Sequence, residues 1–222
     1  VKVVVNRPGY GPAEDTAILA ILPAETSADS EGYTGTYDGQ PHGITVDPDV
    51  DGSTVKYSLT DSDDPADYTL GASPTATDAT AGMTVYFVVT NPNYKPVFGN
   101  ETVTIDKRVV ALTTASGSKE YDTLPLTNPD WDYDAIGNEG FVEGQGFETA
   151  TATGTITNVG TTDNVFSYTL TSATKAENYT INATPGKLTV TASNDMTVSA
   201  SDVSRKYDGH AYGVSAAALV GT

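Results

Sequence analysis

Hydrophobic and polar residues alternate along most of the chain in short runs, and no long stretch repeats its hydrophobic positions every three or four residues. The runs are rich in Val, Ile, Thr, Tyr and Phe and are bounded by Gly, Asp, Asn and Pro. This pattern is typical of short β-strands with one buried face. The strands predicted in this way cover residues 54–60, 83–90, 109–114, 150–157, 165–171 and 197–201.

The stretch 16–22 resembles a helical pattern when it is taken alone. Its counterparts further along the chain, residues 101–105 and 187–191, read Glu-Thr-Val-Thr-Ile and Lys-Leu-Thr-Val-Thr and alternate strictly. We therefore predict a strand at 16–22 as well, because repeated units should share one secondary structure.

Two sequence markers recur with a common period. The first is a Tyr-Asp-Gly turn whose tyrosines are 84 and 86 residues apart. The second is a tyrosine that follows Asn or Gly, at Tyr10, Tyr94 and Tyr179, with spacings of 84 and 85 residues. The copies of the first marker are Tyr37-Asp38-Gly39, Tyr121-Asp122-Thr123 and Tyr207-Asp208-Gly209. Two independent markers with one period indicate tandem repeats.

The period divides the chain into four parts. Residues 1–22 are predicted to be the C-terminal part of one repeat, 23–106 and 107–192 two complete repeats, and 193–222 the N-terminal part of a fourth. We expect the chain to be a piece of a longer array, with a secretion signal and a wall anchor elsewhere in the parent protein.

Units of about 85 residues with many short strands predict an all-β protein. The first choice is a tandem array of small antiparallel β-sandwiches of the Ig-like kind, and the alternative is a β-grasp-like unit. The links between predicted strands of successive units are short, such as residues 106–108, so we expect an elongated, semi-rigid rod.

Charge and composition exclude several classes of function. The chain has 29 acidic and 11 basic residues and a net charge of −18, which opposes binding to nucleic acid and to anionic membranes. It has no Cys, hence no thiolate nucleophile and no Cys-ligated metal, and zinc would have only two histidines available. No apolar run is long enough to cross a membrane, so no membrane insertion is predicted.

Three aspartates form the sharpest candidate for a metal site. Asp47, Asp49 and Asp51 precede Gly52 with the Asp-x-Asp-x-Asp-Gly spacing of calcium loops. The twelfth position, where an EF-hand has Glu, is Ser58. A calcium site is therefore one interpretation, and a solvated acidic turn is the other.

The only Trp forms the candidate ligand site. Trp131 and Tyr133 alternate with Asp130, Asp132 and Asp134. In an extended strand the two rings lie on one side and the carboxylates on the other, an arrangement that suits stacking on a sugar face. The alternative is that Trp131 fills the core of its repeat.

The Tyr-Asp-Gly turn has a structural interpretation. Its Asp can close an Asx turn, its Gly can take a positive φ, and its Tyr can pack at the edge of a domain. Tyr37, Asp38, Gly39, Tyr121, Asp122, Tyr207, Asp208 and Gly209 are therefore predicted to be corner residues. Thr123 replaces the glycine in one copy, so a different turn is expected there.

At these residues the chain resembles the YDG- and MBG-type repeats of large bacterial adhesins. The similar phrases include Lys119-Glu120-Tyr121-Asp122, Thr157-Asn158-Val159-Gly160-Thr161, and Asn178-Tyr179 followed by Gly186-Lys187-Leu188-Thr189-Val190-Thr191. The resemblance covers nearly the whole chain and implies an extracellular module, attached to the cell wall through other parts of its parent, without a catalytic site.

The sequence thus predicts a stalk and adhesion repeat of a surface protein of a Gram-positive bacterium. The repeat is expected to contact neighbouring repeats and to take part in attachment to host or mucus. The alternative is a binding module in which the third repeat recognises mucin glycans or an extracellular protein. No motif indicates an enzyme, and no cofactor other than calcium is suggested.

Overall fold

We describe the chain from a computed structural model. The structure describes residues 2–18, 20–134, 139–194, 197–199, 202, 204–212 and 218–220. It divides into two compact units, residues 1–106 and 107–222. Regular structure in the described residues consists of β-strands and two single-turn 3₁₀ helices, Pro65–Asp67 and Ala176–Asn178, which confirms the prediction of a β-protein. None of the helices in this part of the chain is long and apolar enough to cross a membrane.

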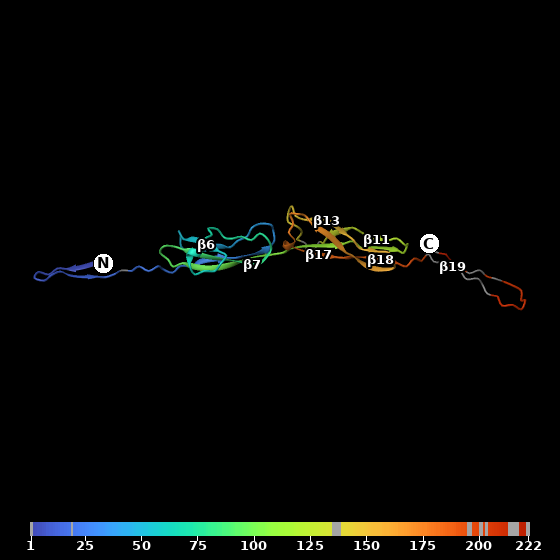
Figure 1. The fold of residues 1–222 in the computed structure, drawn as a ribbon, viewed down its shortest axis with the longest axis horizontal. Helices are drawn as coiled ribbons and strands as arrows, with labels where there is room; N and C mark the ends of the chain where they lie inside the picture. The colour runs from blue at the N-terminus through green and yellow to red at the C-terminus, as the bar shows by residue number, and fades with distance from the viewer. Residues whose placement is uncertain are drawn as a thin grey trace. The chain divides into compact units, whose positions relative to one another are not determined.

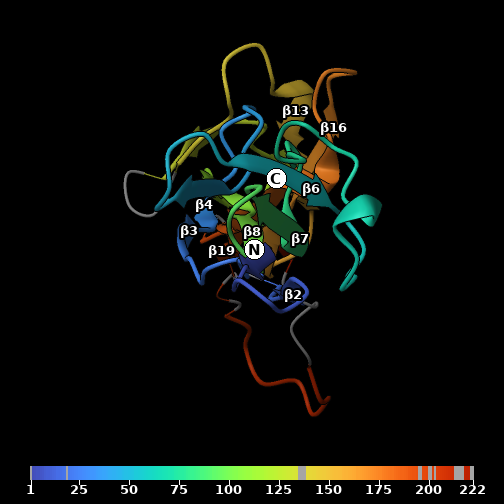
Figure 2. The same ribbon diagram turned by 90° about the vertical axis from the view of Figure 1, so that its left-hand side faces the viewer.

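The first unit, in which Figure 1 labels β6 and β7, is built on a four-stranded mixed sheet with the strand order β4-β8-β7-β6 (Figure 2). Strands β7 and β8 form an antiparallel hairpin, β6 pairs antiparallel with β7, and β4 pairs parallel with β8. A separate antiparallel pair joins β3 and β5. The bounds are β3 Ala28–Glu31, β4 Tyr33–Thr36, β5 Thr45–Pro48, β6 Thr54–Ser58, β7 Thr80–Thr90 and β8 Val97–Asp106.

The core of this unit lies against the two central strands. Val85, Phe87 and Val89 of β7 are buried at every second position, as are Val103 and Ile105 of β8, in agreement with the period of two of a strand. Val88, on the opposite face of β7, is buried as well, with 1% of its surface exposed. Tyr68 closes the core from the loop after β6, with 1% of its surface exposed, and its hydroxyl donates to the carbonyl of Ser62 at 2.9 Å.

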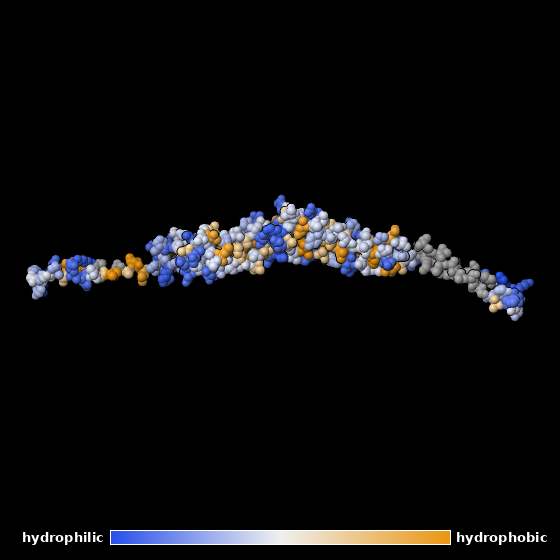
Figure 3. All heavy atoms as spheres, in the orientation of Figure 1, coloured by the Kyte–Doolittle hydropathy of each residue, from blue (hydrophilic) through white to orange (hydrophobic). Residues whose placement is uncertain are grey.

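The strand predicted at 16–22 is wrong in its position. The structure has an antiparallel hairpin of β1, Lys2–Val5, and β2, Ala13–Thr16, and the strand ends there. Ile18, the third residue of the predicted strand, is 95% exposed, whereas Val103, the third residue of its counterpart 101–105, is fully buried. Val103 is covered because β8 has a partner strand on each side, and no described strand pairs with the segment after β2. Figure 3 shows this segment as a hydrophobic stretch beside the hairpin.

The second unit contains two three-stranded sheets and two shorter pairs. In one sheet β9 lies between β12 and β17, and in the other β18 lies between β10 and β15. Strands β17 and β18 follow each other and are separated by Pro185, and β9 and β10 are likewise separated by two residues (Figure 1). The bounds are β9 Arg108–Thr114, β10 Gly117–Glu120, β12 Trp131–Tyr133, β15 Gly160–Asn164, β17 Tyr179–Thr184 and β18 Gly186–Thr191.

The two shorter pairs of this unit are antiparallel. Strands β13 and β16 lie side by side in Figure 2, and β11 pairs with β14. A further pair, β19 with β20, comes near the end of the chain. The bounds are β11 Leu126–Thr127, β13 Phe147–Ala152, β14 Thr155–Ile156, β16 Phe166–Leu170, β19 Thr197–Ser199 and β20 Ala218–Val220.

The strands predicted at 54–60, 83–90, 109–114 and 165–171 all coincide with strands of the structure. The strand predicted at 150–157 is interrupted at Thr153 and Gly154, where the amide of Gly154 donates to the side-chain oxygen of Asn164 at 3.0 Å. For 197–201, the strand is present over Thr197–Ser199, and the remaining two residues lie outside the described part.

Both units share one feature that the antiparallel prediction did not contain. In each, a segment near the beginning of the repeat pairs parallel with a segment at its end. In the first unit β4, which follows β3, pairs with the last strand β8, and Tyr33 lies opposite Val103; in the second β9 pairs with β17, and Arg108 lies opposite Tyr179. Parallel partners need a long crossover connection, and the rest of each repeat supplies it. The sheets are therefore mixed, and the purely antiparallel arrangement is wrong.

Candidate functional site

Trp131 and Tyr133 lie on one face of the short strand β12. The strand pairs antiparallel with β9, so that Trp131 lies opposite Thr114 and Tyr133 opposite Leu112. Residues two apart in a strand share a face. The two rings accordingly touch edge to face, with centroids 5.4 Å apart and an interplanar angle of 78°.

The indole also belongs to a larger aromatic cluster. Its centroid lies 5.8 Å from Phe147 and 5.2 Å from Phe166, and both contacts are edge to face. Its Nε1–H donates to the carbonyl of Ala150 at 3.3 Å. Trp131 is half-buried, so one part of the ring packs into the repeat and the other part faces solvent. The burial of Trp131 is therefore intermediate between a fully packed core residue and a fully exposed surface residue.

An open groove lies over this cluster. It has a cavity volume of about 570 Å³. A groove with aromatic walls and a few polar groups is the kind of surface on which the apolar face of a sugar ring can stack. The larger side chains that line it are Trp131, Tyr133, Phe141, Gln145, Phe147 and Glu148.

One wall of the groove is held in place by β9. The guanidinium of Arg108 donates from Nε to the carbonyl of Gly140 at 2.9 Å and from Nη2 to that of Glu139 at 2.6 Å. The Glu139 carboxylate in turn accepts from the amide of Val109 at 2.8 Å. These bonds attach the segment before Phe141 to the first strand of the repeat.

The next part of the same wall is held by the last strand and by the loop before it. The hydroxyl of Tyr179, a buried residue of β17, donates to Oε1 of Gln145 at 2.8 Å and accepts from the amide of Val142 at 3.2 Å. The amide of Gly146 donates to Oγ1 of Thr174 at 2.8 Å. The described wall is therefore preformed, which reduces the entropy lost when a ligand binds.

The polar groups of the groove suit a neutral, hydroxyl-rich ligand. Glu148 contributes a carboxylate acceptor and Gln145 a side-chain amide. Burial raises the pKa of the Tyr133 hydroxyl above its ordinary value of 10.0, so this group stays a neutral O–H donor at physiological pH.

The sequence identified two of these aromatic residues and missed the others. Phe141, Phe147 and Phe166 come from separate segments that the fold brings together. Phe166 and Tyr168 alternate along β16 as Trp131 and Tyr133 do along β12, and their rings stack with centroids 5.6 Å apart. This second alternation is the signal that would have pointed to the neighbouring strand.

The three aspartates of the calcium hypothesis do not form one group of metal ligands in the structure. Asp47 lies in β5 opposite Asp29 of β3, and the carboxylate of Asp49 accepts a hydrogen bond from the hydroxyl of Ser27. Asp51 is exposed in the turn that Gly52 closes with φ +77°. Among the residues that the structure describes, no three or more His, Cys, Asp or Glu side chains are grouped so that they could hold a metal ion. The calcium hypothesis gains no support from this arrangement.

The three Tyr-Asp-Gly turns have the same hydrogen bond. In each, the Asp carboxylate accepts from the amide two residues later: Asp38 from Gln40 at 2.8 Å, Asp122 from Leu124 at 3.0 Å and Asp208 from His210 at 3.1 Å. Each turn is thus an Asx turn.

The expected exception at Thr123 does not occur. Thr123 has φ +72°, close to the +80° of Gly39 and the +83° of Gly209. The Asx bond of Asp122 and the ammonium of Lys119, which donates to the carbonyl of Leu124 at 2.6 Å, hold the turn in this conformation despite the β-branched side chain. The prediction of a different turn was wrong.

The tyrosines of the three turns differ in exposure. Tyr37 is 4% exposed, Tyr121 37% and Tyr207 95%. In the two complete repeats the tyrosine amide ends the parallel pairing, because Tyr37 donates to the carbonyl of Asp106 and Tyr121 to that of Thr191, both at 2.9 Å. The turn therefore follows the point where the first and last strands separate.

No protein-family model matches the chain, and a search of curated proteins found no match.

Proposed function

We propose that the chain is part of the stalk of a large bacterial cell-surface adhesin and that its repeats act mainly as spacers. The observation that carries the proposal is the parallel pairing, in both complete repeats, of a segment near the beginning of the repeat with a segment at its end. In a unit with this pairing, the chain enters at one end and leaves at the other. Such units can be joined in series without a long return connection.

The connection between the repeats suits this role. Strand β8 ends at Asp106 and β9 begins at Arg108, so that only Lys107 lies between them. A one-residue link restricts the motion between two units much more than a flexible linker would. The net charge of −18 keeps such an array soluble and opposes its association with other acidic chains.

The likeness to YDG- and MBG-type repeats supports the same proposal and adds a location outside the cell. In a β-grasp-like unit the first and last strands pair parallel, whereas an antiparallel Ig-like sandwich has no such pair. The mixed sheets therefore favour the β-grasp-like alternative. Neighbouring repeats of the same chain are then the principal partners.

Small-angle X-ray scattering of the 222-residue chain tests the proposal. A compact protein of this length has a radius of gyration of about 17 Å. A semi-rigid series of units should give a clearly larger value and a distance distribution with a long tail. A value near the compact one would contradict the stalk. Labelling of intact bacteria with an antibody against the chain tests the location, and staining only after lysis would contradict it.

The groove over the aromatic cluster supports a second function, recognition of a glycan by the third repeat. Its preformed wall and its exposed Tyr133 ring are the specific observations in favour. Mucin glycans are the ligand class that fits the proposed surface location.

A glycan array with the chain and with Tyr133→Ala tests this second function. Tyr121→Ala is a matched control, since Tyr121 is exposed to a similar degree, 37% against 45%, but does not line the groove. The only Trp reports on binding directly, because a sugar stacked on Trp131 changes its fluorescence. We expect Tyr133→Ala to abolish binding and the fluorescence change while Tyr121→Ala keeps both. Equal binding by the two variants would exclude the groove as the site.

A further inference from the structure

We propose that the parallel pairing between the initial and final segments of each repeat resists tension applied through the ends of that repeat. This inference rests on the proposed stalk function for its biological setting, since a stalk transmits force between a surface and its attachment point. Its physical basis is independent of that setting. We call this pairing the terminal pair. In repeat two, residues 23–106, it joins residues 24–37 to 94–106, and in repeat three, residues 107–192, it joins residues 108–121 to 179–191.

The direction of the load follows from the topology. Tension reaches the beginning of the first strand and the end of the last strand, and in a parallel pair these two points lie at opposite ends. The force is then directed along the strands and across their hydrogen bonds, so that all the bonds are loaded together. If the force were applied at one end of the pair, the strands would peel apart and the bonds would break one at a time.

Repeat three has a long terminal pair. Six residues of β9 lie opposite β17, and four residues of β10 lie opposite β18. Both ladders have the same offset, since Arg108 faces Tyr179 and Gly117 faces Leu188, 71 residues further in each case. The two ladders therefore form one continuous pairing with a short interruption.

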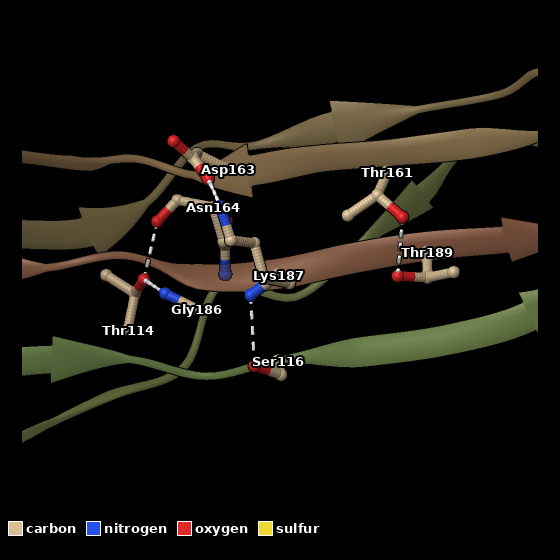
Figure 4. A network of polar contacts seen from close by, with 8 residues as sticks. All are labelled: Thr114, Ser116, Thr161, Asp163, Asn164, Gly186, Lys187 and Thr189. Carbon is tan, nitrogen blue, oxygen red and sulfur yellow. Dashed lines mark hydrogen bonds and ion pairs between the residues drawn. The ribbon is translucent and has the colours of Figure 1, made fainter.

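Side chains bridge that interruption. The amide of Gly186 donates to Oγ1 of Thr114 at 2.9 Å, and the amide of Lys187 donates to Oγ of Ser116 at 3.0 Å (Figure 4). The first and last strands are thus joined by hydrogen bonds even where the ladder is broken. The hydroxyl of Thr114 also donates to the carbonyl of buried Asn164, which links the junction to β15.

Neighbouring strands support the terminal pair from outside. Strand β12 covers the free edge of β9, and β15 covers that of β18. The side chains of Thr161 and Thr189 are hydrogen-bonded at 3.1 Å, and Asp163 forms an ion pair with Lys187 across the β15–β18 pair (Figure 4). A strand held on both sides cannot slide without breaking both ladders.

Repeat two has a shorter terminal pair. Its ladder consists of four residues of β4 opposite β8 and a single parallel bridge between Ala24 and Tyr94. Between them, residues 28–31 pair with β5 and not with the last strand. Repeat two should therefore yield at a lower force than repeat three.

Single-molecule force spectroscopy tests the inference, and the absence of Cys lets an introduced pair define the pulling points. The chain with Lys107→Cys and Ala192→Cys is pulled from opposite ends of the terminal pair of repeat three. The control carries Lys107→Cys and Glu177→Cys, so that the same repeat is pulled from one end. All three positions are exposed. We expect the first geometry to need at least about a twofold higher unfolding force, because many hydrogen bonds are loaded together. Equal forces would overturn the proposal.

A third pair, Leu22→Cys with Lys107→Cys, pulls repeat two from its opposite ends. Its unfolding force should lie below that of repeat three, and an equal or higher force would overturn the assignment of the load to the terminal pairs. The melting temperature of each variant is compared with that of the parent chain. Equal values confirm that the substitutions leave the repeats folded.

The outcome is separable from that of the stalk proposal. Force resistance is measured on single molecules, whereas elongation and cell-surface exposure are measured by scattering and antibody labelling. If the unfolding force depends on the pulling direction but the chain is compact, the inference about the terminal pair holds and the stalk proposal fails. If the chain is elongated but the forces are equal, the stalk proposal holds and the inference about the terminal pair fails.

Discussion

Thr123 adopts the left-handed backbone conformation that Gly39 adopts in the preceding repeat, with φ of +72° and +80°. A β-branched residue is strained there, because its side chain clashes with the backbone in a way that glycine avoids.

Thr123→Gly should stabilise repeat three by about 0.5–1 kcal/mol. The left-handed conformation costs an L-residue roughly 1–2 kcal/mol, and glycine's greater freedom in the unfolded state offsets about 0.4–1 kcal/mol of the gain. The reverse change, Gly39→Thr, should destabilise repeat two by a similar amount. Differential scanning calorimetry of both variants measures the effect. Thr123→Ala, which removes only the branch, is the control and should fall between the parent chain and Thr123→Gly. A lower melting temperature for Thr123→Gly would show that the turn is not strained.

The corner aspartates should make stability depend on pH under acidic conditions. The ammonium of Lys119 and the amide of Leu124 lower the pKa of Asp122 below its ordinary value of 3.8. The amide of Gln40 and the ring of His42 lower that of Asp38 in the same way. A depressed pKa means that the ionised carboxylate stabilises the folded state above the unfolded-state pKa. This stabilisation is lost as the pH falls through the folded-state pKa.

Carbon-13 NMR of the carboxyl groups checks this prediction. The midpoints of Asp38 and Asp122 should lie below 3.8, and Asp122→Asn should weaken the acid dependence of repeat three. A midpoint at or above the ordinary value would contradict the hydrogen bonds assigned to the corner.

Asn164 should be among the most sensitive positions of repeat three. Its side chain is fully buried; Nδ2 donates to the carbonyls of Ala115 and Asn128 at 2.8 Å each, and Oδ1 accepts from the amide of Gly154 at 3.0 Å. Asn164→Ala leaves three backbone groups without these partners and should cost about 3 kcal/mol. Urea unfolding measures the change. Asn182→Ala, at an exposed position of β17, should cost less than about 0.5 kcal/mol. Equal effects of the two substitutions would show that the buried bonds contribute little.

Gly186 should not tolerate a side chain. A Cβ at this position would lie 2.4 Å from the carbonyl oxygen of Thr114 and 2.6 Å from that of Ala115. Because these atoms belong to the backbone of the first strand, Gly186→Ala must push the terminal pair apart and should cost about 2 kcal/mol. Gly146→Ala is the matched control, since a Cβ there meets no atom within 4 Å. If both variants melt at the parent temperature, the close approach of the strands at this junction is not real.

Local sequence patterns predicted most of the strands, and they failed where pairing decides the outcome. The segment after β2 was predicted to be a strand only because its counterparts alternate, and Ile18 is exposed, since no described strand covers it. Hydrophobic alternation indicates which residues can be buried, but a strand forms only when another strand satisfies its backbone.

In the candidate groove, too, the sequence pattern indicated some residues and the tertiary structure brought in the others. Trp131 and Tyr133 were visible as an alternating pair, because two residues in one strand always share a face. Phe141 and Phe147 were not, since they belong to a loop and to another strand that reach the groove through the bonds of Arg108 and Tyr179.

The sequence by itself determined the β-structure, the repeat period and the Asx turns of Asp38, Asp122 and Asp208, because these depend on residues close together in the chain. The tertiary structure alone decided that segments from the beginning and the end of each repeat pair parallel and that Trp131 is half-buried under a groove. The physical reason is that these features depend on contacts between residues tens of positions apart. The local pattern of hydrophobic and polar residues does not specify which partner is chosen.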